Sequence, residues 1–324
     1  MTSLPIIDFE PFRTGGLDQK RQIAKQIDRA CRTYGFFMLS GHGLSKAIIQ
    51  KTFDDAKYFF DLPIAEKDKI SIDQSPVHRG WYRLSEEILD QKENPLGDFK
   101  EGIKIGNDCG TKHPRVLANV PLHGANQWPH IDGWQHTMEQ CYGACSDLSR
   151  ELMQAFALGL DMDAGFFDKW LEEPMATLSP IYYPPQPTDK LEGQIAGQLS
   201  AGAHTDFGCL TLLIQHGVPG LEVFSHKDGW ISVPVIEDCI VINIGDMMAR
   251  WTNDHYPSTL HRVRNLSGVG RQSLAFFFDP DANADLSPLP GCLEKNQSPN
   301  YAPATCVEHL VEKINRSFDY RRDG

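Results

Sequence analysis

A series of short apolar segments in the second half of the chain constrains the fold most strongly. Turn-forming residues separate these segments at 217–220, 226–229 and 245–246. The segments that we predict as strands cover residues 178–183, 210–214, 221–224, 230–233, 239–244 and 273–278. Many short strands at regular spacing are typical of a β-sandwich or a jelly roll. The sequence therefore predicts a β core in this half of the chain.

Helical patterns flank this core. Apolar residues recur at steps of three and four from about Trp134 to Leu160, which predicts a long helix that supports a sheet. Two shorter helices are predicted over residues 17–34 and 45–60, with short strand candidates at 4–9 and 36–39. We therefore predict a mainly β protein with flanking helices. Residues 1–130 form its N-terminal region and residues 131–324 its core, and the two parts make one integrated unit.

Charge and composition exclude several classes of partner. The formal net charge of −12 argues against nucleic acid or an anionic membrane as the main partner, because binding phosphates needs a basic face. We find no run of about 18 apolar residues, so we predict no membrane span. The first residues lack the pattern of a secretory signal, and the eight cysteines show no CxxC spacing. We therefore expect reduced thiols in a cytoplasmic protein, and the sequence leaves the oligomeric state unknown.

Two histidines and one aspartate form a candidate metal site. His204 and Asp206 stand two apart at the start of a predicted strand, so their side chains can converge on one point. His261 comes from a later segment that a jelly roll can bring close. Two imidazoles and one carboxylate suit non-heme Fe(II) oxygenases, without excluding Mn(II), Co(II), Ni(II) or Zn(II). By proximity alone, three other histidines are alternatives for the third ligand: His216, His226 and His255.

Arg271 and Ser273 form a candidate carboxylate clamp. They also stand two apart at the start of an apolar strand, so both side chains face the same way. An arginine fork with a hydroxyl suits a carboxylate, and a buried arginine without an anionic partner is costly. The alternative is an internal salt bridge between Arg271 and one of the 43 acidic residues.

Together these motifs resemble a known family. His204-Thr205-Asp206, His261 and Arg271-Gln272-Ser273 are similar to the HxD…H…RxS pattern of the isopenicillin N synthase-like branch of the Fe(II)/2-oxoglutarate-dependent dioxygenases. Supporting matches run along nearly the whole chain: LPIID at 4–8, GFF at 35–37, GHG at 41–43, YYPP at 182–185, LTLL at 210–213, PGLEV at 219–223 and NIGD at 243–246.

The resemblance implies a fold, an activity and site residues. The implied fold is a double-stranded β-helix, or jelly-roll, core with an N-terminal helical region and a long supporting helix. The implied activity couples decarboxylation of 2-oxoglutarate and activation of O2 to the oxidation, most commonly the hydroxylation, of a small-molecule substrate. The residues assigned in this way are His204, Asp206 and His261 to iron, and Arg271, Ser273 and Tyr183 to 2-oxoglutarate.

Two alternatives stay open. An isopenicillin N synthase-like oxidase uses O2 without a 2-oxo acid, and its Arg-Ser pair holds the carboxylate of the substrate. That synthase has a glutamine near its C-terminus that reaches the metal, whereas residues 318–324 of this chain contain none, which favours the dioxygenase. The chain also has Ile181 where many plant members place asparagine, which bears on the role of Tyr183. The second alternative is an inactive binding protein of the same fold.

The substrate is not specified by any of these motifs. In the family that the chain resembles, substrate pockets draw on the N-terminal region and the final helix, here predicted over about 305–318. The candidate substrate residues are Arg79, Tyr82, Arg83 and Phe278. The segment 79–83 is equally compatible with an edge strand that exposes its arginines. An arginine that faces the iron would favour an amino acid or another small carboxylate as substrate.

Overall fold

Two β-sheets form the centre of the protein in the computed structural model, which describes residues 3–185, 198–293 and 297–318. The larger sheet has the strand order β1-β2-β10-β7-β12-β5-β4-β3, and the smaller has the order β6-β11-β8-β9. The strands are β1 (Ile6–Asp8), β2 (Phe36–Ser40), β3 (Gly80–Tyr82), β4 (Glu101–Gly106), β5 (Thr177–Tyr183), β6 (Ala201–His204), β7 (Leu210–His216), β8 (Leu221–Ser225), β9 (Gly229–Ser232), β10 (Ile240–Ile244), β11 (His261–Val263) and β12 (Arg271–Phe278). The strands predicted for the second half are all present, in the two-sheet arrangement that a jelly roll requires.

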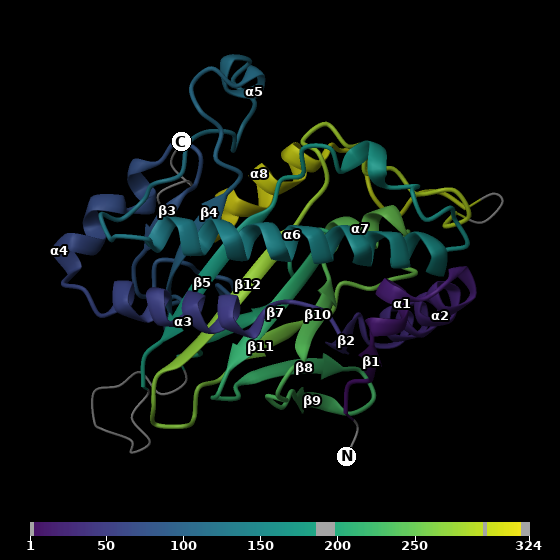
Figure 1. Ribbon diagram of the computed structural model, residues 1–324, viewed down its shortest axis with the longest axis horizontal. Helices are drawn as coiled ribbons and strands as arrows, with labels where there is room; N and C mark the ends of the chain where they lie inside the picture. Colours follow the sequence, from purple (N-terminus) through teal and green to yellow (C-terminus); the bar gives the residue numbers. More distant parts are fainter. Residues whose placement is uncertain (1–2, 186–197, 294–296, 319–324) are drawn as a thin grey trace.

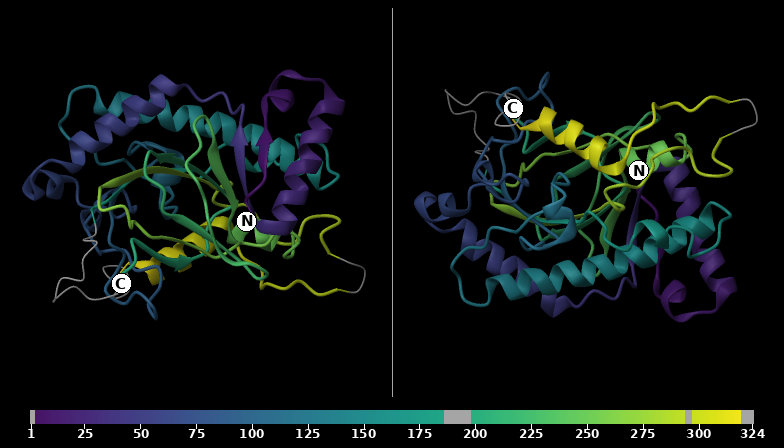
Figure 2. Two further views of the ribbon diagram at one scale, coloured as in Figure 1. Left: turned by 90° about the horizontal axis from the view of Figure 1, so that it is seen from below. Right: turned by 90° about the horizontal axis from the view of Figure 1, so that it is seen from above.

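Helices cover the outer face of the larger sheet, where α6 and α3 lie across the strands (Figure 1). Figure 2 shows α8 on the opposite side of the strands from α3 and α6. The helices are α1 (Glu10–Thr14), α2 (Leu17–Tyr34), α3 (Lys46–Phe60), α4 (Ile64–Lys67), α5 (Pro114–Leu117), α6 (Trp134–Gly159), α7 (Asp246–Trp251) and α8 (Cys306–Ser317), with short 3₁₀ turns at 68–70, 72–74 and 168–170. The predicted long supporting helix is thus confirmed as α6.

Strand β12 shows how alternate side chains divide the interior. Phe276 and Phe278 belong to the main hydrophobic core with α6, where Tyr142 meets the ring of Phe276 edge-on at 5.2 Å. Ala275 and Phe277 point the other way and pack with residues of β6 and β11. The outer face of β12 therefore carries the core, and its inner face borders the space between the two sheets.

A glycine joins the N-terminal helices to the larger sheet. Gly35 follows α2 with a φ of +64°, a left-handed conformation that favours glycine, and the chain enters β2 directly. A Cβ at this position would also lie 2.4 Å from the carbonyl oxygen of Pro257. β2 then pairs with β10, which places the N-terminal region against the core strands. None of the described helices combines the length and the apolar character needed to cross a bilayer.

Candidate metal centre

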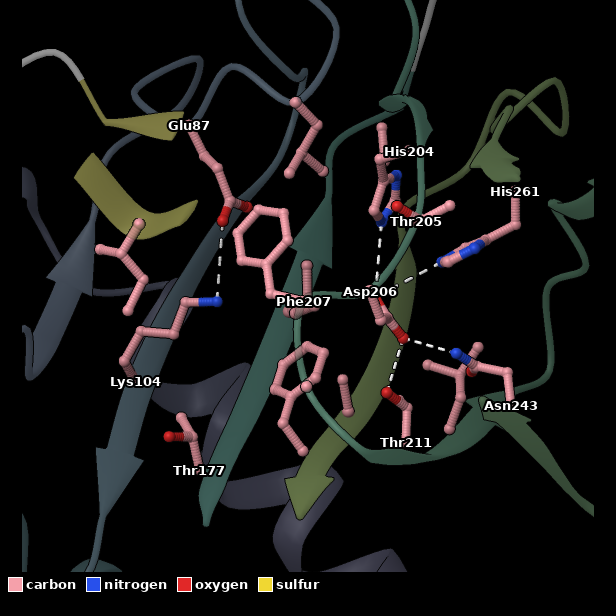
Figure 3. A pocket seen from close by; sticks show the side chains of 18 of the residues that line it. Glu87, Lys104, Thr177, His204, Thr205, Asp206, Phe207, Thr211, Asn243 and His261 are labelled. Carbon is pink, nitrogen blue, oxygen red and sulfur yellow. Dashed lines mark hydrogen bonds and ion pairs between the residues drawn. The ribbon is translucent and has the colours of Figure 1, made fainter. Parts of the chain in front are cut away.

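Strand pairing brings the three predicted ligands together. His204 is the last residue of β6 and His261 the first of β11, and the antiparallel register pairs them directly. Asp206 follows β6 by two residues, so its side chain returns to the side of His204 (Figure 3). The Nε2 atoms of His204 and His261 lie 3.8 Å and 3.6 Å from Asp206 Oδ1. One ligand atom from each residue fits within a 4.8 Å cluster, which is the size of a metal site.

Hydrogen bonds orient each of these groups for a metal. His204 Nδ1 lies 2.7 Å from the carbonyl oxygen of Gly202, and His261 Nδ1 lies 3.1 Å from that of Thr259. Because a carbonyl oxygen only accepts, each Nδ1 carries the proton and each Nε2 keeps its lone pair for a cation. This donor set suits a divalent metal such as Fe(II).

The carboxylate of Asp206 is held by its second oxygen. Thr211 Oγ1 and Asn243 Nδ2 donate to Asp206 Oδ2 at 2.5 Å and 2.6 Å. Oδ1 therefore remains directed at the two imidazoles. Sequence reasoning did not assign Thr211 or Asn243 to the site, although both fall in segments that carried the resemblance.

Burial and mutual charge set the protonation of the cluster. Burial first, and then the neighbouring His261, lower the pKa of His204 to about 3. Burial would raise the pKa of Asp206, but the two histidines and the Thr211 hydroxyl outweigh it and hold that pKa well below its ordinary value. A neutral imidazole beside an ionised carboxylate is the state in which both groups bind a metal.

The other candidate histidines lie elsewhere. His216 stacks on Phe53 with ring centroids 4.6 Å apart, and His226 meets Phe224 at 5.5 Å in the β8–β9 hairpin. His255 follows α7, between that helix and β11. In the described part of the chain, none of the three joins the cluster of His204, Asp206 and His261.

Arg271 is completely buried beside this cluster and has an incomplete set of partners. Its Nε donates to the carbonyl oxygen of Val218 at 3.2 Å, and Nη2 donates to Gln215 Oε1 at 3.1 Å. Nη1 and the Ser273 hydroxyl are buried without a hydrogen-bond partner. Over the described ranges no acidic side chain forms an ion pair with Arg271, so the alternative of an internal salt bridge gains no support. An arginine fork and a hydroxyl left open in this way fit a carboxylate.

A cavity of about 160 Å³ extends from the three candidate metal ligands. Tyr183 lines it and also covers the Arg271 guanidinium, whose central carbon lies 4.7 Å from the centre of the tyrosine ring. Arg271 and Ser273 are not among the residues that line it. The other walls come from the N-terminal region, from β4, β5 and β12, and from α8 and the residue that follows it, with Arg79, Lys104, Phe277, Leu310, Ile314 and Phe318 among the lining residues.

Of the four predicted substrate residues, Arg79 alone lines this cavity. Tyr82 packs in a separate cluster with Ile72 and Phe318, and β3 is the edge strand of its sheet. Arg83 points away, with its Nη2 atom 2.8 Å from Asp68 Oδ1.

Phe278 does not line the cavity, because the alternation of side chains along β12 places it on the other face of the strand. Arg271 and Ser273 share the inner face of β12, and an even-numbered residue of the same strand must lie on the other face. Phe278 is accordingly buried in the main core, and its neighbour Phe277 lines the cavity. The alternation of side chains was the signal that could have identified Phe277.

The last helix packs against the segment that carries the candidate ligand Asp206. His309 Nε2 donates to the carbonyl oxygen of Phe207 at 2.9 Å. Lys313 forms an ion pair of 2.6 Å with Asp246 and lies 5.8 Å from the centre of the Phe207 ring. The Asp246 amide in turn donates to the carbonyl oxygen of Asp206 at 2.8 Å. α8 is therefore tied to the turn that carries one of the candidate ligands.

Comparison with known proteins gives matches along the whole chain. Residues 4–131 match the family described as the N-terminal region of a non-haem dioxygenase in morphine synthesis, and residues 176–280 match the 2OG-Fe(II) oxygenase superfamily. The 2-oxoglutarate-Fe(II) type oxidoreductase hxnY of Emericella nidulans is 36% identical over 332 residues, covering 99% of this chain and 93% of that protein. A homoarginine-6-hydroxylase of Oryza sativa is 34% identical, covering 98% of each. A full-length Neurospora crassa protein, crystallised in complex with alpha-KG and thymine, superposes with a TM-score of 0.84 at 28% identity, over 97% of this chain and 96% of that one.

Proposed function

This chain belongs to the 2OG-Fe(II) oxygenase superfamily, and from that premise we propose that His204, Asp206 and His261 bind its iron and that Arg271 and Ser273 bind its 2-oxoglutarate. The protein is an oxidoreductase of the Fe(II)/2-oxoglutarate-dependent dioxygenase type, with the jelly-roll core of that family. The observation that supports the residue assignment best is the convergence of two Nε2 atoms and one Oδ1 atom on one point, with every other polar atom of the three side chains already hydrogen-bonded.

The reaction consumes one 2-oxoglutarate and one O2 for each substrate oxidised. One oxygen atom enters succinate as CO2 leaves, and the other is inserted into a substrate C–H bond to give the alcohol. The site residues would hold iron, which would supply the redox chemistry that activates O2. Hydroxylation is the outcome that we propose for this chain.

The side chains bind and orient the reactants. The carbonyl oxygens of Gly202 and Thr259 fix the two imidazoles, and Thr211 and Asn243 fix the carboxylate of Asp206. These contacts hold the two Nε2 atoms and the Asp206 Oδ1 atom in place, where they would bind iron.

The far carboxylate of 2-oxoglutarate fits the open donors of the clamp. Nη1 of Arg271 and the hydroxyl of Ser273 are those donors. Tyr183 covers Arg271 and also lines the cavity, so we assign it to the same cosubstrate site. The clamp is buried, so a charge-assisted contact made there is stronger than the same contact in water.

Anaerobic titration tests this function without a known substrate. Fe(II) is added to the metal-free protein with and without 2-oxoglutarate, and the visible charge-transfer band of the chelate is recorded. We expect the band only when both are present, with succinate released once O2 is admitted. A protein that binds Fe(II) and consumes O2 but shows no band at millimolar 2-oxoglutarate is an oxidase of the isopenicillin N synthase type. Absence of both band and O2 uptake identifies an inactive binding protein.

Several finer assignments stay predictions. They include the isopenicillin N synthase-like branch, the cytoplasmic location and the division of the chain at residue 130. The relatives do not fix the substrate, since those named include a homoarginine-6-hydroxylase and a clavatol oxidase. The substrate class must therefore be inferred from the residues of this cavity.

A further inference from the structure

A row of three largely buried cations lines the cavity wall opposite the candidate metal ligands. Lys100 precedes β4 by one residue, and Lys104 and Gly106 follow on the same face of the strand. Gly106 has no side chain, and the guanidinium of Arg79 occupies that space, since a Cβ on Gly106 would lie 2.0 Å from Arg79 Nη2. The Arg79 guanidinium thus lies next to Lys104 on this face of β4, and Lys100 lies on the same face beyond Gly102.

Two carboxylates balance part of this positive charge. Glu87 Oε2 lies 2.8 Å from Lys100 Nζ, and Glu87 Oε1 lies 3.7 Å from Lys104 Nζ. Asp98 Oδ2 lies 3.0 Å from Lys100 Nζ. Burial would raise the pKa of Glu87, but Lys100 and Lys104 outweigh it and lower that pKa to about 2, so Glu87 is ionised at neutral pH. Three cations therefore face two carboxylates.

Arg79 is the cation of this row for which the described residues provide no carboxylate partner. The residue is 7% exposed, and its Nη1 and Nη2 atoms reach only the carbonyl oxygens of His78 and Leu122, at 3.4 Å and 3.3 Å. Its Nε atom is buried without a partner. No carboxylate in the described segments lies within ion-pair distance of it, and the Asp279 carboxylate, also on the cavity wall, accepts the Cys209 amide instead. A buried cation in this position is stabilised by an anionic ligand.

Lys104 is held so that its ammonium group points into the cavity. Its Nζ atom lies 5.4 Å from the centre of the Tyr82 ring and 5.2 Å from that of Phe277. Figure 3 shows Lys104 beside Glu87, across the cavity from His204 and Asp206. The long contact with Glu87 leaves N–H donors of the ammonium group for a further acceptor.

From this arrangement we propose that the substrate is an organic acid whose carboxylate binds to Lys104 and Arg79, with the carbon to be oxidised directed towards His204 and Asp206. The inference rests on the proposed function of the metal site and adds the substrate class to it. A cationic substrate would meet the excess positive charge of this wall, and a neutral substrate would leave it uncompensated.

Matched acids and amides test the inference in the wild-type protein. The probes are benzoate, phenylacetate and hexanoate, each compared with its primary amide, which has nearly the same shape and no charge. Each probe is added anaerobically to protein loaded with Fe(II) and 2-oxoglutarate, and the shift of the charge-transfer band gives its affinity. Succinate release after admission of O2 gives a second readout. We expect at least one acid to bind about ten- to hundredfold more tightly than its amide.

Substitutions then locate the contact. Lys104→Met and Arg79→Gln should each weaken binding of that acid by about ten- to hundredfold, and Lys104→Arg should retain most of the affinity. Lys46→Met and Arg83→Gln are the matched controls, because both side chains form ion pairs at the surface. The affinity for 2-oxoglutarate should be the same in all five variants.

The outcomes separate this inference from the proposed function. Equal binding of each acid and its amide, unchanged affinity in both Lys104→Met and Arg79→Gln, or no binding of any probe at about 20 mM would each overturn the inference while the 2-oxoglutarate band persists. Loss of that band in the wild-type protein would instead contradict the proposed function. The comparison of acid with amide needs no variant, so it stands even if a substituted chain does not fold.

Discussion

His204 and His261 face each other across the antiparallel pair β6 and β11, with their ring centroids 4.2 Å apart. Backbone hydrogen bonding therefore sets the spacing of two of the three candidate ligands, although they are far apart in the sequence. The third, Asp206, is positioned by side-chain contacts from β7 and β10. Substituting a ligand and substituting a residue that supports a ligand should therefore affect metal binding to different degrees.

Removing a ligand should abolish metal binding while the fold persists. We expect His204→Ala to lose Fe(II) binding and with it the release of succinate from 2-oxoglutarate, because two ligands alone do not hold a divalent ion tightly. Anaerobic titration with Fe(II) measures the first effect. His226→Ala, in the β8–β9 hairpin, is the control that should behave as wild type. Retention of stoichiometric iron by His204→Ala would contradict the ligand assignment.

Removing the support of Asp206 should weaken metal binding without abolishing it. Asn243→Ala and Thr211→Val each delete one donor to Asp206 Oδ2. Outer partners of this kind are worth about 10- to 100-fold in metal affinity. Competition with a chelator of known affinity measures the change, and circular dichroism confirms that the chain is folded. Wild-type affinity in both variants would show that Asp206 needs no such support.

Substitutions of the clamp should affect the cosubstrate alone. Arg271→Gln should raise the KM for 2-oxoglutarate by about ten- to hundredfold, because a charge-assisted contact is lost. Ser273→Ala should have a smaller effect, about fivefold, in line with one neutral hydrogen bond. Affinity for Fe(II), measured without 2-oxoglutarate, should be unchanged in both. A fall in iron affinity of similar size would assign Arg271 a structural role instead.

Phe278 and Phe277 should differ in what they affect. Phe278→Ala removes a fully buried ring from the main core and should lower the free energy of unfolding by about 3–5 kcal/mol. The protein that remains folded should bind 2-oxoglutarate normally. Phe277→Ala removes one ring beside Lys104 and should alter the binding of acid probes more than stability. Urea titration and the charge-transfer band measure the two effects, and the reverse pattern would place Phe278 in the substrate pocket.

The stability of the metal-free protein should depend on Asp279 as the pH changes. Burial raises the pKa of Asp279 from 3.8 to about 7, so the folded state holds this proton more tightly than the unfolded chain does. Its contribution is fully present below about pH 4 and is lost as the pH rises towards about 7. Asp279→Asn keeps an oxygen to accept the Cys209 amide and removes the titration. We expect the variant to gain stability over wild type between about pH 4 and pH 8, on the order of a few kcal/mol. Parallel stability curves from urea titration would contradict the assignment.

The sequence predicted those features that depend on local alternation. The parity of residues two apart placed His204 with Asp206 and Arg271 with Ser273, and the same rule applied to Phe278 would have moved that prediction to Phe277. The choice of His261 over His216, His226 and His255 depended on the resemblance, because the register between β6 and β11 is not visible in either strand alone. Residues 319–324, whose lack of glutamine favoured the dioxygenase, lie outside the described residues.

The cation row was not predicted because it depends on contacts between strands. Arg79 reaches the cavity only because β3 pairs with β4 and Gly106 leaves room for its guanidinium. Arg79 and Arg83 are four residues apart in the sequence and look equivalent there. The neighbouring strand distinguishes them, since Arg83 pairs with Asp68 on the outside.

The contacts of α8 have a consequence for when the chain can bind iron during its synthesis. The turn that carries Asp206 is held by His309 and Lys313, which are made about a hundred residues later. A chain still emerging from the ribosome can pair β6 with β11 and yet lack this support. We expect iron to be captured stably only once α8 has been made and has packed against this turn, so that chains truncated before α8 do not retain a redox-active metal.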